Sequence, residues 1–252
     1  HRQQDKAFTR WVERNVHGHK VSGYAAITVS LKAYDHATGN ITAEQMELVA
    51  DLADRYSFGE ARVSHEQNLI LADVAKRDLH ALWQELRANG LATPTVGLLT
   101  DIICCPGGDL CSLANAKSTP IAMAIQERLG DLDYLHDIGE VSLNISGCMN
   151  ACGHHHVGNI GILGVDKRGE EWYQVSIGGC QGNHTTLGSI LGPSFAAPEV
   201  PRVVEQLIDV YLESRHAEEI FIDTVERPGI APFKARVYGS HDSTQDRKVA
   251  NG

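Results

Sequence analysis

The 252-residue chain has no apolar run near the roughly 20 residues that a membrane-spanning helix needs, and residues 1–6 lack the apolar region of a signal peptide. Basic residues are also in the minority, because 22 Lys and Arg stand against 32 Asp and Glu, a formal net charge of −10. A negative protein disfavours general binding to nucleic acid or to an anionic membrane. We therefore expect a cytoplasmic protein with neither a membrane nor nucleic acid among its partners.

Cysteine is scarce, since six residues in 252 are too few for disulfides to hold a fold of this size. Hydrophobic residues at 42% and charged residues at 21% are ordinary globular values, which excludes a disordered or low-complexity chain. At about 150 residues per domain, the length predicts one large domain or two small ones. In a reducing cytosol, clustered cysteines are typically metal ligands or catalytic groups, so their spacing matters most.

Residues 21–98 have the pattern of a ferredoxin-like module, preceded by an N-terminal extension at residues 1–20. The expected order is strand 24–32, a helix from 43 to about 57, strands 60–64 and 68–72, helix 79–89 and strand 95–99. The first helix opens on a capping box of Thr42 and Gln45, and Asp78 is the expected cap of the second. The first strand is expected to be half-buried, because apolar residues alternate with polar ones, namely Ile27, Val29 and Leu31 with Thr28, Ser30 and Lys32. This order is that of a split βαβ unit.

Residues 99–238 predict a second, mixed α/β domain that opens on a loop of cysteine, glycine and proline. The expected elements are helix 112–129 with a kink or break at Pro120, strands 141–146, 159–165 and 172–177, a turn at 166–169 and helix 200–212. Residues 239–252 are polar and charged, and we expect a mobile tail there. The expected fold class is therefore α+β, a ferredoxin-like module followed by a mixed α/β domain.

Four of the six cysteines form two close pairs, Cys105 with Cys111 and Cys148 with Cys152. Four thiolates are the donor set of an iron–sulfur cluster and of a structural zinc site. Zinc sites usually pair ligands two to four residues apart, which the second pair meets and the first, with five intervening residues, does not. Glycines beside both pairs allow backbone amides to approach the sulfurs of a cluster. The spacing favours a cluster and leaves zinc or unliganded core cysteines as alternatives.

Both cysteine segments resemble those of the siroheme-dependent sulfite and nitrite reductases, whose motif is Cys-x5-Cys followed, after a long gap, by Cys-x-Asn-x-Cys. The resemblance covers residues from about 10 to 238, and residues 146–164 are most similar to the assimilatory sulfite reductase haemoproteins. It implies a [4Fe–4S] cluster held by Cys105, Cys111, Cys148 and Cys152. It further implies that Cys152 also ligates the iron of a siroheme and that Asn150 lies beside this cofactor.

Residues 62–68 resemble the Arg-x-Thr/Ser-x-x-Gln-Asn segment of the same family. The resemblance implies that Arg62, Gln67 and Asn68 face the carboxylates of the macrocycle. It also assigns Arg62 a share in the positive field that holds an anionic substrate. From the residues alone, an ion pair on a strand surface is an equal alternative for Arg62.

The resemblance implies an oxidoreductase, a six-electron sulfite reductase that forms sulfide in sulfur assimilation, with a flavoprotein subunit or a ferredoxin as electron donor. Reduction of nitrite to ammonia is the first alternative. A zinc-stabilised, non-catalytic module and a haem-free electron-transfer protein are the others. Enzymes of this family contain two such pairs of domains, and this chain matches the second, cluster-bearing half. We therefore expect weak catalysis by this chain alone.

Other conspicuous residues have alternative interpretations. Cys104 and Cys180 match no motif position and are expected to be packing residues. The histidines at 154–156 cannot all face one ion from regular structure, so local packing is the first interpretation and a proton relay the alternative. Lys117 and Lys234 are expected to be solvated, with a role near the cofactor as the alternative.

Overall fold

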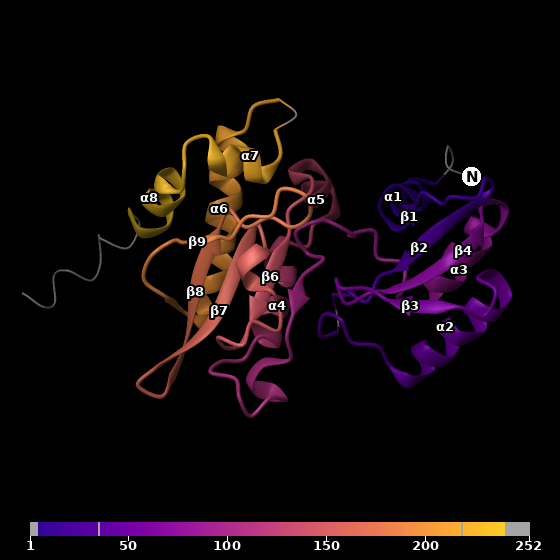
Figure 1. The fold of residues 1–252 in the computed structure, drawn as a ribbon, viewed down its shortest axis with the longest axis horizontal. Helices are drawn as coiled ribbons and strands as arrows, with labels where there is room; N and C mark the ends of the chain where they lie inside the picture. The colour runs from indigo at the N-terminus through magenta and orange to yellow at the C-terminus, as the bar shows by residue number, and fades with distance from the viewer. Residues whose placement is uncertain (1–4, 35, 218, 240–252) are drawn as a thin grey trace, which may run out of the picture. The chain divides into compact units, whose positions relative to one another are not determined.

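The structure, a computed structural model, describes residues 5–34, 36–217 and 219–239; from residue 240 onward, the expected tail lies outside these residues. The chain forms two compact units, divided between Ile103 and Cys104, whereas the sequence pattern places the division after residue 98 (Figure 1). Among the described residues, none of the helices combines the length and the apolar character that a bilayer crossing requires.

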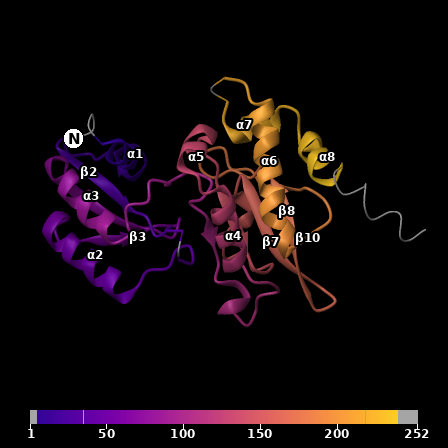
Figure 2. The same cartoon turned by 180° about the vertical axis from the view of Figure 1, so that it is seen from behind.

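The first unit contains a four-stranded antiparallel sheet in the order β1-β2-β4-β3. Its elements are α1 (Lys6–Asn15), β1 (Val16–His17), β2 (Tyr24–Val29), α2 (Ala43–Tyr56), β3 (Ala61–Val63), β4 (Leu69–Ala75) and α3 (Leu79–Ala88). The order from β2 to α3 confirms the expected split βαβ pattern, and Figure 2 shows α2 and α3 on the same face of the sheet.

The strand expected at residues 95–99 does not form. This segment turns twice, since Leu98 N–H donates to Thr95 O (2.9 Å) and Asp101 N–H donates to Leu98 O (2.8 Å), and Gly97 has a positive φ of 77°. The sheet edge beside β2 is instead occupied by β1, in which Val16 pairs with Ile27.

Helix α1, expected in an extension outside the module, lies in its core. Asp5 caps the helix by accepting hydrogen bonds from the backbone of Ala7 and Phe8. Residues at helical spacing then form one buried face, and this face joins the core residues of the sheet and of the other two helices: Phe8, Trp11 and Val12 with Ile27, Val49, Leu52, Leu71, Leu82 and Leu86.

The polar residues of the strand expected at 24–32 are also buried, which corrects the expectation of a half-buried strand, and β2 itself ends at Val29. Thr28, Ser30 and Lys32 are all excluded from solvent. Two of these side chains have polar partners, since His17 Nε2 lies 2.8 Å from Thr28 Oγ1 and Lys32 Nζ donates to Ile102 O (2.7 Å). The hydroxyl of Ser30 has no hydrogen-bond partner among the described residues. The alternation of apolar and polar residues over 27–32 therefore does not separate a buried face from an exposed one.

The two helices of the module begin close to where they are expected, but their caps differ. The capping box is confirmed, because Gln45 N–H donates to Thr42 Oγ1 (3.2 Å) and Thr42 N–H donates to Gln45 Oε1 (3.1 Å). Asp78 makes no capping hydrogen bond to the described backbone at the start of α3, because a 3₁₀ turn over Lys76–Asp78 precedes the helix.

The second unit is built on a sheet with strand order β10-β8-β7-β6-β5, and β9 pairs with β8 off this path. Its elements are β5 (Ile103–Cys104), α4 (Thr119–Leu129), α5 (Leu132–Ile138), β6 (Leu143–Ser146), β7 (Ile160–Lys167), β8 (Glu170–Ile177), β9 (Ser189–Ile190), β10 (Phe195–Ala196), α6 (Val200–Ser214), α7 (Phe221–Glu226) and α8 (Ala231–Gly239). Figure 2 shows α4 and α6 side by side in front of this sheet.

Most expected elements of this unit are present. Strands β6, β7 and β8 and helix α6 confirm the predictions, and Arg168 and Gly169, both with positive φ, form the turn between β7 and β8. The helix expected from residue 112 starts only at Thr119, so Pro120 lies in its first turn and does not kink it. Residues 112–118 are a loop because Gly147 O accepts hydrogen bonds from Asn115 N and Ala116 N (2.8 and 3.1 Å).

Candidate functional site

The two cysteine pairs follow neighbouring strands of the second sheet. Cys105 comes directly after β5, and Cys148 comes two residues after β6. The strands are in register there, since Cys105 N–H donates to Ile145 O (3.1 Å). The sheet thereby brings together two cysteines that lie 43 positions apart in the chain.

Gly147 joins the two cysteine loops. Its N–H donates to Cys105 Sγ (3.1 Å), and its carbonyl accepts from the segment that follows Cys111. A Cβ at Gly147 would lie 2.9 Å from Gly107 Cα and 2.7 Å from Ala116 O, so only glycine fits at this contact.

The remaining two thiols lie nearer the surface. Cys111 is half-buried, and its N–H donates to Gly107 O (2.9 Å). Cys152 is exposed. The loop after it is fixed from β6, because Gly153 N–H donates to Ser146 Oγ (3.1 Å) and Asn144 Nδ2 donates to Gly153 O (3.0 Å).

The donor chemistry of these loops fits an iron–sulfur cluster. All six cysteines are free thiols, four of them lie on the two joined loops, and one sulfur already accepts a backbone N–H. Among the described residues, no three His, Cys, Asp or Glu side chains converge closely enough to hold a single metal ion. A cluster carries its four thiolates on separate iron atoms, so it holds them farther apart than one ion does.

Large apolar side chains stand exposed on the same loops. Leu110 and Leu113 flank Cys111, and Met149 follows Cys148 with 82% of its surface exposed. Asn150, the asparagine of the motif, is exposed beside Met149. Exposed polar residues of the same loops, Asp109, Ser112 and Asn115, stand beside these apolar side chains.

The other cysteines and the histidine triplet are held by local contacts. Cys104 is buried with its Sγ at 3.2 Å from Cys105 O, and Cys180 Sγ lies 3.4 Å from Gln181 O. Of the triplet, only His155 is buried, and its ring packs on His156 with 3.9 Å between centroids. Burial, followed by the charge of His156, lowers the pKa of His155 to about 4, so its imidazole is neutral at neutral pH. His154 and His156 are both exposed.

The lysines singled out in the sequence are exposed. Lys117 Nζ lies 3.5 Å from Asp109 Oδ1. The backbone carbonyl of Lys117 accepts a hydrogen bond from the hydroxyl of Tyr173 (2.7 Å). Burial raises the pKa of Tyr173, so the hydroxyl stays a donor. Lys234 is exposed on α8.

The three residues of the 62–68 segment differ in exposure. Arg62 lies on the exposed strand β3 and forms an ion pair with Glu60. Gln67 has a positive φ of 59° in the turn between β3 and β4. Asn68 is only 1% exposed, and its amide is engaged inside the first unit.

A buried polar network surrounds Asn68. Its Oδ1 accepts from Leu31 N (3.0 Å), and its Nδ2 donates to Asp101 Oδ1 (3.0 Å). Burial raises the pKa of Asp101, although the ammonium of Lys32 and the hydrogen bonds from Gly97 and Asn68 oppose this shift. The sequence pattern misses this network, because Asp101 lies 69 positions after Lys32 and matches no motif.

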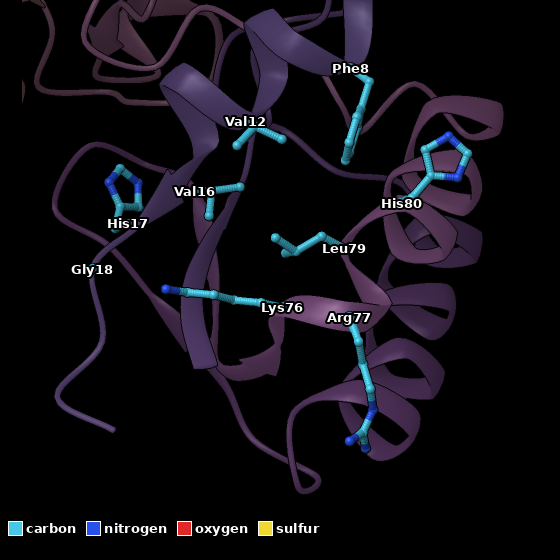
Figure 3. Close-up of a pocket in the computed structure, with 9 residues that line it drawn as sticks. All are labelled: Phe8, Val12, Val16, His17, Gly18, Lys76, Arg77, Leu79 and His80. Atoms are coloured by element: carbon cyan, nitrogen blue, oxygen red, sulfur yellow. The ribbon is translucent and has the colours of Figure 1, made fainter. Parts of the chain in front are cut away.

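The first unit also contains a cavity of about 570 Å³. It lies among α1, β1 and the start of α3, and Figure 3 shows Phe8, Val12, Val16 and Leu79 around it. Arg77 extends away from these apolar side chains. None of the site residues expected from the sequence lines this cavity.

Comparisons with known proteins cover both units. Residues 17–89 match the family described as the nitrite/sulfite reductase ferredoxin-like half domain, and residues 97–245 match the nitrite and sulphite reductase 4Fe-4S domain. The chain is 28% identical over 198 residues to the assimilatory ferredoxin-dependent nitrite reductase of Haloferax mediterranei, which covers 77% of this chain and 34% of that protein. It is 24% identical over 202 residues to an assimilatory-type sulfite reductase of Nitratidesulfovibrio vulgaris, with coverage of 80% and 88%.

The fold agrees with a solved structure, that of the Mycobacterium tuberculosis NirA protein. The TM-score is 0.69 at 25% identity, covering 85% of this chain and 40% of that one. The chain thus spans about a third of the length of the nitrite reductases that it matches. With more than half of its residues in the 4Fe-4S domain match, the chain belongs to the nitrite and sulphite reductase family, a family of oxidoreductases.

Proposed function

We propose that the second unit binds a [4Fe–4S] cluster through Cys105, Cys111, Cys148 and Cys152. The observation that carries this proposal is the hydrogen bond from Gly147 N–H to Cys105 Sγ, which ties one cysteine loop to the other. Amide donors to thiolate sulfur are a recurrent feature of such clusters, because they offset the negative charge of the ligands. The family match to a 4Fe-4S domain over residues 97–245 supports the same assignment.

We propose further that Cys152 bridges the cluster to a siroheme, with Asn150 beside it. Both side chains are exposed on the outer face of the loops, as a contact with a second cofactor requires. The apolar side chains of the same face suit the flat surface of a macrocycle.

In the first unit, we propose that Arg62 and Gln67 contact the carboxylates of the siroheme and that Asn68 positions the turn which carries Gln67. The guanidinium of Arg62 is exposed and forms its ion pair with Glu60 at the surface, so a carboxylate can replace that partner. We also propose that the positive charge of Arg62 helps to hold the anionic substrate. The resemblance implies that Asn68 too faces the carboxylates, but Asn68 is 1% exposed and both ends of its amide are engaged within the unit, which suits a supporting role instead.

The activity that we propose for the whole reductase is six-electron reduction of sulfite to sulfide, with nitrite reduction to ammonia as the second candidate. Bound together, the cluster and the siroheme would supply electrons to a single substrate atom. Relatives of both kinds match this chain, an assimilatory-type sulfite reductase and ferredoxin-dependent nitrite reductases. The names of the latter favour a ferredoxin as donor, with a flavoprotein subunit as the alternative. A cytoplasmic setting suits six free thiols.

The test is the metal content of anaerobically prepared chain. We expect about four irons and four acid-labile sulfides per chain once the cluster is reconstituted, with an additional iron and macrocycle absorption bands when siroheme is bound. Cys105→Ser should lose most of the iron, whereas the matched control Cys180→Ser, which removes a thiol outside the paired loops, should keep it. Stoichiometric zinc without sulfide would contradict the proposal.

The choice between sulfite and nitrite is tested by steady-state kinetics of the whole reductase with a chemical reductant. We expect a higher kcat/KM for sulfite than for nitrite, with sulfide as the product. A much higher value for nitrite, without sulfide, would reverse the order of the two candidates. Because the chain spans about a third of the matched nitrite reductases, we expect weak turnover by the isolated chain even with its cluster intact.

A further inference from the structure

Ser118 occupies the position before α4 but does not cap it. A serine at this place normally accepts a hydrogen bond from a backbone N–H of the first helical turn. Here the described structure contains no such bond, and Ser118 has helical dihedrals of −100° and −41°. Its side chain is fully buried, with 0% of its surface exposed. A buried hydroxyl that does not cap the helix is expected to have another hydrogen-bond partner.

The hydroxyl of Ser118 faces a cysteine sulfur. Its Oγ lies 3.5 Å from Cys105 Sγ, the atom that also accepts the N–H of Gly147 at 3.1 Å. A cysteine that ligates a cluster is a thiolate and can only accept, so the hydroxyl must then be the donor. Cys105 would thus have two hydrogen-bond donors.

Two glycines make room for this contact. A Cβ at Gly107 would lie 2.7 Å from Ser118 Oγ and 2.4 Å from Ser118 N, and a Cβ at Gly147 would lie 3.0 Å from the same Oγ. Gly107 also has a positive φ of 61°, which disfavours any larger residue. The hydroxyl is therefore held against the sulfur by backbone on two sides.

We infer that Ser118 is a positioning residue that donates a hydrogen bond to the Cys105 thiolate and thereby raises the reduction potential of the cluster. The inference rests on the proposed function. Reduction adds one electron to the cluster and increases its negative charge, which hydrogen-bond donors to the ligand sulfurs stabilise. No covalent bond forms or breaks at Ser118, and its hydroxyl keeps its proton.

The experiment compares Ser118→Ala with two controls in the chain reconstituted with ferrous iron and sulfide. Ser118→Thr keeps the hydroxyl. Ser176→Ala removes another buried hydroxyl of the same unit, one that donates to Gly161 O rather than to a cysteine. The readouts are iron and sulfide content, then the midpoint potential from an electron paramagnetic resonance titration of the reduced cluster.

We expect Ser118→Ala to keep the cluster and to disfavour its one-electron reduction about tenfold, a fall of 59 mV. Ser118→Thr and Ser176→Ala should stay at the wild-type potential. An unchanged potential in Ser118→Ala overturns the inference. If Ser118→Ala cannot hold the cluster, Ser118→Thr decides: a wild-type potential supports the inference, and a lost cluster or a shifted potential indicates packing and overturns it.

The same experiment separates this inference from the proposed function. A wild-type chain that takes up no iron and sulfide would contradict both the proposed cluster and the inference about Ser118. A wild-type chain with a full cluster, and a Ser118→Ala variant with the same potential, would remove the role of Ser118 alone.

Discussion

At the scale of single residues, Asn68 is a buried amide with both of its ends hydrogen-bonded. Its amide accepts from Leu31 N–H and donates to the carboxylate of Asp101, both at 3.0 Å. Asn68→Ala removes the partner of two buried groups, the N–H of Leu31 and the carboxylate of Asp101. Each lost hydrogen bond lowers the free energy of unfolding by about 1–3 kcal/mol. We expect the free energy of unfolding of the first unit to fall by about 2–4 kcal/mol, measured by urea titration.

The matched control for this variant is Asn40→Ala, which removes the same side chain from an exposed loop position. Its effect should stay within about 0.5 kcal/mol, as for other exposed substitutions. Equal effects of the two substitutions would show that the amide of Asn68 contributes nothing through its partners.

A second residue-scale prediction concerns acid. Arg227, followed by the backbone N–H of His216, holds the pKa of Glu219 at about 2, below its usual 4.5. Because the folded pKa is the lower one, the stability contributed by Glu219 is present above about pH 4.5 and is lost as the pH falls toward 2. In Arg227→Gln we expect the pKa of Glu219 to rise toward 4.5, measured by NMR titration of the side-chain carboxyl carbon.

Arg168→Gln is the control for this titration. Arg168 lies in the exposed turn between β7 and β8, so its loss should leave the pKa of Glu219 unchanged. A pKa that stays near 2 in Arg227→Gln would assign the shift to the remaining donors, the N–H of His216 and the hydroxyl of Thr224.

At the scale of elements, the sequence predicts best where the signal is local. Thr42 and Gln45 lie three positions apart, and their capping box forms as expected. The start of α4 depends on a distant group, because Gly147 O takes the N–H groups of Asn115 and Ala116 and keeps residues 112–118 out of the helix. A pattern of apolar residues carries no information about that carbonyl.

The same distinction applies to the candidate site. Cys-x5-Cys and Cys-x3-Cys can be read directly from the chain, whereas the serine beside Cys105 cannot. Ser118 precedes Thr119 and Pro120, which in sequence is an ordinary helix start. Only the folded chain shows that its hydroxyl faces sulfur.

Gly153, which follows Cys152, has no space for a larger side chain. A Cβ at this position would lie 1.9 Å from Ile145 O, a backbone atom of β6, so the strand or the loop has to move. Overpacking of this kind costs about 1–3 kcal/mol or more. For Gly153→Ala we expect iron and sulfide content after reconstitution to fall several-fold.

Gly239→Ala is the matched control, since a Cβ there meets no atom of the described residues within 4 Å and Gly239 has no positive φ. It should bind iron as the wild type does. Normal iron content in Gly153→Ala would mean that the loop can shift without loss of the cluster, and that Cys152 needs no fixed backbone.

At the scale of the whole molecule, the position of the boundary between the two units is itself testable. The sequence pattern places it after residue 98, and the contacts place it after Ile103. The apolar core of the first unit runs from Phe8 to Leu91, so a fragment of residues 5–98 keeps all of it. What that fragment lacks is Asp101 and the carbonyl of Ile102, the acceptor of the buried ammonium of Lys32.

We therefore expect residues 5–103 to unfold cooperatively in urea, followed by the fluorescence of Trp11 and Trp83, which are both buried. Residues 5–98 should be less stable by about 3–5 kcal/mol, because a buried charge without its partners is strongly destabilising. Lys32→Met in the shorter fragment should restore much of this loss, since an apolar side chain of similar length needs no acceptor. Equal stability of the two fragments would instead place the end of the module where the sequence pattern puts it, and would make residues 99–103 a connection rather than part of the fold.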